Sequence, residues 1–274
     1  MLEVWAALVK ASLYGALLSA AGAPLAVLSL RPSAALADYA MRVMRVGAIA
    51  AIALSVAAAA LLFMRLGGAF DQPTFSAVFS SGPGAALALQ IAGAALLLAP
   101  ADEDLSGHLW RMTGALTMTA SVVFNGHAAA LSPTAGLVAM VHVTAASWWV
   151  GSLWILRRTC VDADRDEMVR LVLRFSSRAV FIVAGLIVAG VVLIIALIDF
   201  SISPWLTDYV RTLALKLAFV ALVLLLAAHN KFQLTPRLPG EVARLRRSIN
   251  VELMAIACVL ITTAVLTTYF APEP

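Results

Sequence analysis

Residues 175–198 read FSSRAVFIVAGLIVAGVVLIIALI, a run whose only charged residue is Arg178. About 20 apolar residues in a helix, each rising ~1.5 Å, cross the ~30 Å hydrocarbon core of a bilayer. The whole chain has this character, because 62% of its 274 residues are hydrophobic and only 12% are charged, about half the ~25% of soluble domains. Its Ala, Leu and Val runs lack the alternation of outer-membrane strands. The sequence therefore predicts an all-α, polytopic membrane helical bundle.

Short polar stretches separate the apolar runs, so we expect about eight transmembrane helices in a single transmembrane domain, residues 1–274. The first run has no basic leading segment and continues to Leu30, which is too long for a signal-peptide core. It is therefore expected to be a retained helix. The expected spans are residues 3–30, 43–64, 83–100, 110–131, 135–156, 175–198, 208–228 and 249–270.

The basic residues give this bundle a direction. Fifteen of the nineteen lysine and arginine residues fall in four connections, at residues 31–45, 101–111, 157–178 and 231–247. The positive-inside rule places these connections in the cytoplasm and both chain ends outside, in the periplasm of a bacterial inner membrane. Basic residues at helix ends face anionic lipid headgroups, so the net charge of +4 predicts membrane lipids as partners and no nucleic acid.

Ionisable residues inside the spans are costly and are the first candidates for function. His127 lies near the end of the fourth span and His142 near the start of the fifth. Each is about six or seven residues from the turn at residues 132–136, which places both ~10 Å deep in the outer leaflet. One membrane histidine alone is most simply an interhelical hydrogen bond. Two at matched depth on adjacent helices predict a shared metal site, open to the outside.

Several residues near this pair are candidates for a pathway or for support of the site: Asn125, Met118, Met140, Trp149, Lys216 and Glu252. The methionines are out of phase with the histidines, which favours packing over a copper path. Trp149 lies two turns from His142 on the same face and is expected to pack beneath it.

Two of these candidates carry charge. Lys216 in the seventh span could hold an anion or tune a carboxylate. Glu252 opens the eighth span near Arg246 and Arg247, which predicts a salt bridge. His108 and His229 sit at cytoplasmic helix ends and are expected to be solvated. Cys160 and Cys258 belong to no CxxC pair, which predicts neither a disulfide nor a thiolate metal site.

These residues carry a family resemblance. Residues 142–153, HVTAASWWVGSL, resemble the H-x6-W-x-G-G-L motif of the copper resistance protein D family (CopD, PcoD), with Ser152 in place of the second glycine. Residues 126–128 resemble the preceding GHA. The rest of the pattern is similar at Arg174-Phe175-Ser176, at Leu215-Lys216-Leu217, at Asn230 with Pro236, and from Glu252 to Pro272. The resemblance covers residues 120–272.

The resemblance implies a copper transport protein of the inner membrane that moves copper from the periplasm toward the cytoplasm. His127 and His142 match the histidines of the family and are the residues carried over as copper ligands. Some relatives carry a fused CopC-like domain, so a separate periplasmic CopC-like chaperone is the expected partner. The sequence contains no Walker or phosphorylation motif and no ATPase domain. No enzyme activity is therefore predicted, and uptake would be passive or ion-coupled.

Two other functions stay open on the sequence alone. Two histidines at one depth could also ligate a haem from both sides, as in a membrane cytochrome, although a short hairpin leaves little width for a porphyrin. The chain could instead be a metal-sensing or scaffold subunit that signals through its basic connections without moving copper. The oxidation state of the copper is not specified by the sequence.

Overall fold

The computed structural model describes residues 1–68, 71–102, 104–125, 131–197 and 208–270. This part of the chain is built of helices, which confirms the predicted all-α class. Its nine α-helices are α1 (Leu2–Leu30), α2 (Ala34–Arg65), α3 (Gln72–Phe79), α4 (Gly82–Leu98), α5 (Leu105–Ala120), α7 (Pro133–Asp162), α8 (Arg165–Leu197), α9 (Asp208–His229) and α10 (Val242–Tyr269). Three short segments continue two of them: the 3-10 turn η1 (Ser121–Phe124) after α5, and the π turn η3 (Asn230–Leu234) with the 3-10 turn η4 (Thr235–Arg237) after α9.

Six of the described helices are long and apolar enough to cross a membrane: α1, α2, α7, α8, α9 with its extension, and α10. The pair α3 and α4 makes a seventh if it counts as one span, bent by 73°. The chain is thus a multi-pass membrane protein by helix composition. The expected eight spans are borne out for six or seven, because α5 is only 16 residues long. The short helix α3 was not expected at all.

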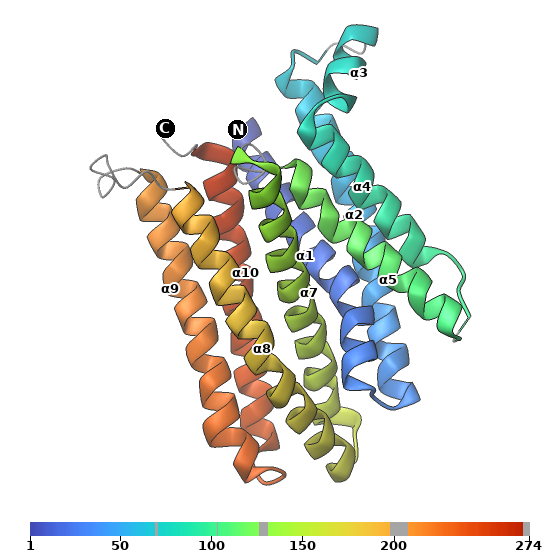
Figure 1. The fold of residues 1–274 in the computed structure, drawn as a ribbon, viewed down its shortest axis with the longest axis vertical. Coiled ribbons are helices and arrows are strands. Elements are labelled where there is room, and N and C mark those ends of the chain that lie inside the picture. Colours follow the sequence, from blue (N-terminus) through green and yellow to red (C-terminus); the bar gives the residue numbers. More distant parts are fainter. Residues whose placement is uncertain (69–70, 103, 126–130, 198–207, 271–274) are drawn as a thin grey trace.

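The helices form three groups (Figure 1). The central pair is α1 and α7, which pack against each other along much of their length. On one side lie α2, α4 and α5, and on the other lie α8, α9 and α10. The first residues of α1 and the last turn of α10 are at the same end of the bundle, where α3 projects beyond α4 (Figure 1).

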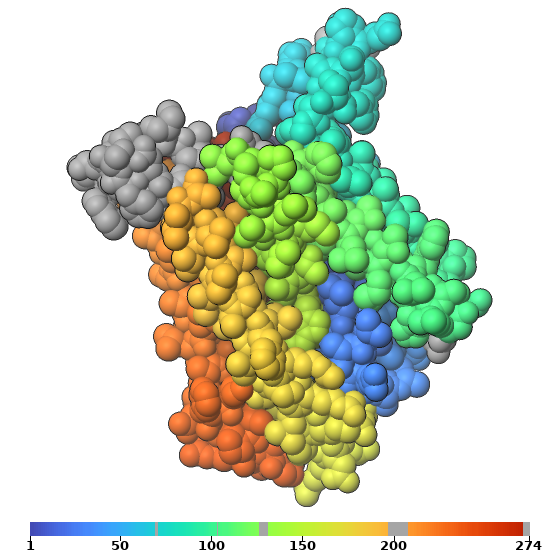
Figure 2. Space-filling view, in the orientation of Figure 1, coloured from blue at the N-terminus to red at the C-terminus, as the bar shows by residue number. Residues whose placement is uncertain are grey.

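The central pair meets backbone to backbone. A Cβ on Gly22 of α1 would lie 1.9 Å from the carbonyl oxygen of Ser147, and one on Gly151 of α7 would lie 2.2 Å from Gly22. Small residues allow such close helix contact in membranes. Ser152, which stands in the place of a family glycine, is completely buried. From the side of Figure 2, little of the first half of α1 is visible, because α7 covers it.

Side-chain caps set the start of several helices. Asp71, Ser81, Asp104 and Ser132 each accept a hydrogen bond from a backbone N–H in the first turn of the helix that follows. This satisfies a donor that has no partner inside the helix. The Gly107 N–H bonded to Asp104, assisted by the Ser106 hydroxyl, holds the pKa of that exposed carboxyl below its usual range. The caps explain why the helices begin where they do.

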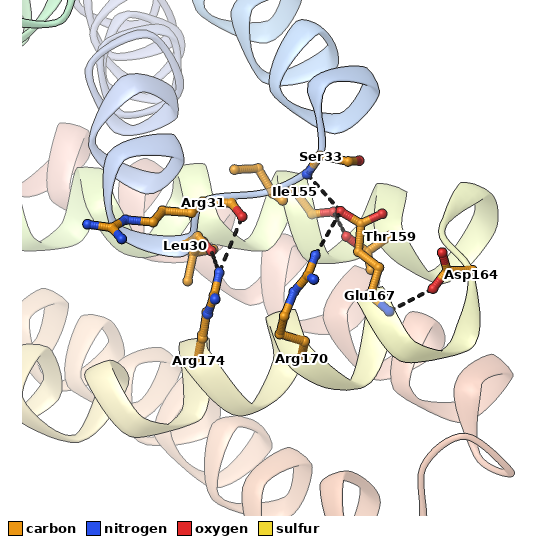
Figure 3. A network of polar contacts seen from close by, with 9 residues as sticks. All are labelled: Leu30, Arg31, Ser33, Ile155, Thr159, Asp164, Glu167, Arg170 and Arg174. Carbon is orange, nitrogen blue, oxygen red and sulfur yellow. Dashed lines mark hydrogen bonds and ion pairs between the residues drawn. The ribbon is translucent and has the colours of Figure 1, made fainter. Parts of the chain in front are cut away.

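A polar network joins the α1–α2 connection to the start of α8 (Figure 3). Glu167 accepts a hydrogen bond from the Ser33 backbone N–H at 2.7 Å and lies 3.6 Å from the Arg170 guanidinium. Arg174 donates to the carbonyl oxygen of Leu30 at 2.9 Å, at the C-terminal end of α1. This network fixes α8 to the central pair at the end opposite Leu2.

Candidate functional site

A buried carboxylate sits where four helices meet. Glu252 of α10 is 1% exposed, and its Oε1 accepts a hydrogen bond from the Trp149 indole Nε1 at 2.7 Å. Its Oε2 accepts from the Asn230 side-chain Nδ2 at 3.1 Å. The Phe175 ring of α8 lies edge-on to Trp149, with centroids 5.5 Å apart. We call these four residues the carboxylate cluster.

The predicted salt bridge of Glu252 with Arg246 and Arg247 is wrong. The carboxylate is held by two uncharged donors and forms no ion pair within the described part of the chain. Arg246 and Arg247 are six and five residues before Glu252 and therefore lie on other faces of α10. A carboxylate buried at low dielectric without a cation partner is costly when charged, so this arrangement suits a group that takes up a proton or a cation.

Asn230 reaches the carboxylate because the helix changes its winding there. It is the first residue of the π turn after α9, and the Thr235 hydroxyl bonds back to its carbonyl oxygen at 2.8 Å. A π turn inside a helix is frequent at functional sites. The Asn230 Oδ1 is buried and accepts no hydrogen bond. An acceptor oxygen beside the carboxylate therefore remains available.

His142 faces α8. A Cβ on Gly190 would lie 3.7 Å from His142 Cε1, an ordinary van der Waals distance, so the ring packs against this part of α8. The ring also interacts with the Leu186 backbone of α8 and electrostatically with Lys216 of α9. Its Nδ1 is buried and has no hydrogen-bond partner. A nitrogen in this condition is able to accept a proton or bind a metal ion.

The opposite side of the same helix turn contacts α5. The Thr144 hydroxyl donates to the Met140 carbonyl oxygen at 2.8 Å, and its oxygen lies 3.0 Å from the Thr119 hydroxyl of α5. Two residues along a helix are separated by ~200°, so His142 and Thr144 point toward different neighbours. His127 lies outside the described residues, and the shared site of His127 and His142 stays a prediction.

Sequence comparison identifies part of the chain. Residues 169–266 match the family model Copper resistance protein D. No curated protein and no solved structure matches the chain. The predicted resemblance, which extended over residues 120–272, is thus supported over this CopD region.

The CopD region supplies most of the carboxylate cluster. It contains most of α8, all of α9, both segments of the turn after α9 and most of α10, and with them Phe175, Asn230 and Glu252. Lys216 also lies in it. Trp149 and His142 are on α7, outside the matched residues. The CopD region therefore wraps around one face of α7 and contacts the two α7 residues that the sequence singled out.

The remaining candidates are Met118, Met140 and Asn125. Met118 is completely buried, and its side chain fills the contact at Gly93 of α4. Met140 is half-buried, and Asn125 follows η1 in an extended conformation. These positions agree with packing roles for the methionines. The described residues contain no group of three or more His, Cys, Asp or Glu side chains able to hold a metal ion.

Sequence reasoning missed a buried polar chain outside the CopD region. Ser55 of α2 donates to Gln90 of α4 at 3.2 Å, and Gln90 donates to the Ser121 hydroxyl of η1 at 3.2 Å. All three residues are buried. Gln90 is the only polar side chain in the expected span 83–100. This isolated polar residue was the signal in the sequence that could have predicted the buried hydrogen bonds. It ties α2, α4 and the end of α5 together.

Proposed function

We propose that this protein is an inner-membrane copper transport protein that takes copper from the periplasm toward the cytoplasm. The observation that carries the proposal is the match of residues 169–266 to Copper resistance protein D. It falls on helices long and apolar enough to cross a membrane, and it contributes the polar groups that face α7. Copper is the cargo of this proposal and not a resident cofactor.

The proposed membrane arrangement has eight spans and both chain ends in the periplasm. Helix α5 with η1 is the eighth span, because 16 α-helical and four 3-10 residues extend for about 32 Å. An even number of spans agrees with the start of α1 and the last turn of α10 lying at one end of the bundle (Figure 1). The four basic connections lie at the opposite end, which the positive-inside rule assigns to the cytoplasm.

In this arrangement copper enters at the outer leaflet through His127 and His142. Support comes from the unpartnered Nδ1 of His142 and from the preference of imidazole for copper. Lys216, which acts electrostatically on His142, opposes a bound cation when it is charged, so occupancy of the site favours a neutral lysine or a nearby anion. Glu252, deeper toward the cytoplasmic end, is the group available to carry a proton or pass on a cation.

Copper binding and flux test this function together. The variant H127A/H142A should bind one copper ion fewer than the wild type in detergent and should lose copper uptake in proteoliposomes. H229A is the matched control, because His229 is an exposed residue at the last turn of α9, and it should behave like the wild type. Unchanged stoichiometry and affinity in H127A/H142A would contradict the histidine site. Binding without flux in the wild type would indicate a sensor, and a Soret band without added metal would indicate a haem protein.

A further inference from the structure

A small cavity lies at the end of the bundle opposite Leu2. It has a volume of about 110 Å³ and is formed between the end of α1, the start of α2 and the start of α5. Pro24 and Val27 of α1 form its apolar wall. Its remaining lining includes a histidine, two methionines and an aspartate. The cavity is far larger than the ~10–15 Å³ that one water molecule requires.

The potential ligands come in two pairs, each on one helix face. His108 and Met112 are four residues apart on α5, and Asp38 and Met41 are three residues apart on α2. Residues three or four apart lie above one another on a helix. Two helix faces therefore present one imidazole, two thioethers and one carboxylate to the same cavity.

The orientation of His108 leaves one ring nitrogen free. Its Nδ1 lies 2.7 Å from the backbone carbonyl oxygen of Asp104. A carbonyl oxygen only accepts hydrogen bonds, so Nδ1 carries the proton, and in the neutral ring Nε2 has the available lone pair. A hydrogen bond of this kind from the second nitrogen is the usual way that proteins orient a metal-binding histidine.

The charged residues of the lining indicate which kind of ion the cavity would bind. Arg111 also lines the cavity, with its guanidinium bonded to the Ala101 carbonyl oxygen at 3.0 Å. Arg111 and Asp38 balance each other in formal charge, so the lining offers little attraction to a divalent ion. Thioether sulfur prefers Cu(I), so the two methionines of the lining favour this ion.

We propose that the cavity between α1, α2 and α5 binds Cu(I) through His108 Nε2 and the thioether sulfurs of Met41 and Met112. This assigns a second metal site to the protein, at the end that the basic connections place in the cytoplasm. It replaces the expectation that His108 is merely solvated. The site needs none of the residues of the outer site, so it is independent of the direction of transport.

The test is a Cu(I) titration of the purified full chain, with ascorbate as reductant and bicinchoninate as competing chelator. The main variant is M41L/M112L, because leucine keeps nearly the volume of methionine and removes only the sulfur. It should lose one bound Cu(I) or bind it at least tenfold more weakly. M44L is the matched control, since Met44 is buried one turn further along α2 and is not part of the lining.

Comparison with H127A/H142A separates this proposal from the proposed function. If the inner site exists, H127A/H142A keeps the Cu(I) that M41L/M112L loses. If M41L/M112L binds as much Cu(I) and as tightly as the wild type and M44L, the inner site is overturned while the outer site is untouched. Failure of H127A/H142A to change any binding, together with the loss in M41L/M112L, would overturn the outer site alone. H108Q should reproduce the loss seen in M41L/M112L, and unchanged binding in H108Q would exclude the histidine as a ligand.

Discussion

The central pair α1 and α7 and the outer helices α8 and α9 are held in very different ways. In its most apolar stretch, 56% of α1 is buried inside the protein, whereas only 11% of α8 and of α9 is. Glycines bring α1 and α7 into backbone contact, but Gly185 of α8 has open space around it. The centre is held by close backbone packing, while the outer helices bury less of their surface and combine apolar packing on α7 and α10 with polar and aromatic contacts.

The difference separates the helices that stabilise the bundle from the helices that the family model matches. The CopD region covers most of α8, all of α9 and most of α10 and does not include either helix of the central pair. Its polar residues Asn230 and Glu252 reach inward to α7. The central pair therefore provides the scaffold, and the buried polar groups of the CopD region lie where α10 and the turn after α9 contact it.

The largest effect is expected at the central contact. In G151A the new Cβ would lie 2.2 Å from the backbone of Gly22, where no side chain can move away. The loss of stability should reach or exceed the top of the ~1–3 kcal/mol range of overpacking. Thermal unfolding in detergent measures it. G185A in α8 is the control and should unfold at the same temperature as the wild type. Equal melting temperatures for the two variants would refute the contrast between centre and edge.

A smaller effect is expected where the outer helices meet α7. E252A leaves the Trp149 indole N–H and the Asn230 amide without their acceptor. A buried donor without a partner costs ~1–3 kcal/mol, so a loss of about 2 kcal/mol is expected in detergent unfolding. E252Q should lose less, because its carbonyl oxygen still accepts from Trp149. If E252A were as stable as E252Q, the carboxylate would not be holding α9 and α10 to α7.

The smallest effect is expected at the attachment of α8 to the α1–α2 connection. E167A removes the acceptor of the Ser33 N–H and the partner of Arg170, which should cost ~1 kcal/mol. D166A removes a neighbouring exposed carboxylate from the same helix turn, so it reproduces the change in helix-dipole interaction without the hydrogen bond. E167A should therefore unfold at a lower temperature than D166A. Equal melting temperatures for the two variants would exclude a role for the network in stability.

Much of the fold could be predicted from hydropathy alone. The apolar run at residues 175–198 lies almost entirely in α8, and the predicted first span coincides with α1. The fourth span was less predictable, because its apolar pattern continues past Ala120 while the backbone tightens into the 3-10 turn η1. Hydropathy reports the partition of side chains between lipid and water and contains no information on the winding of the backbone.

The candidate site was predictable in its residues and not in its partners. Glu252 and His142 were identified because ionisable groups in apolar spans are costly, and Trp149 because it lies two turns from His142 on the same face. That Trp149 donates to Glu252 depends on the crossing of α7 and α10, and that Asn230 joins them depends on the π turn. Such contacts arise from packing between distant segments. The sequence neighbours Arg246 and Arg247 were misleading because proximity along the chain does not mean a shared helix face.

The contact between α1 and α7 also has a consequence for assembly. Ser29 of α1 and Trp148 of α7 form a hydrogen bond although they are 119 residues apart. The ribosome makes α1 first, and the helices α2 to α5 follow it before α7 emerges. Until α7 arrives, the face of α1 that carries Gly22 has no partner helix to pack against. The innermost contact of the bundle is therefore completed late in synthesis, by a helix that must join α1 after α2, α4 and α5 are already made.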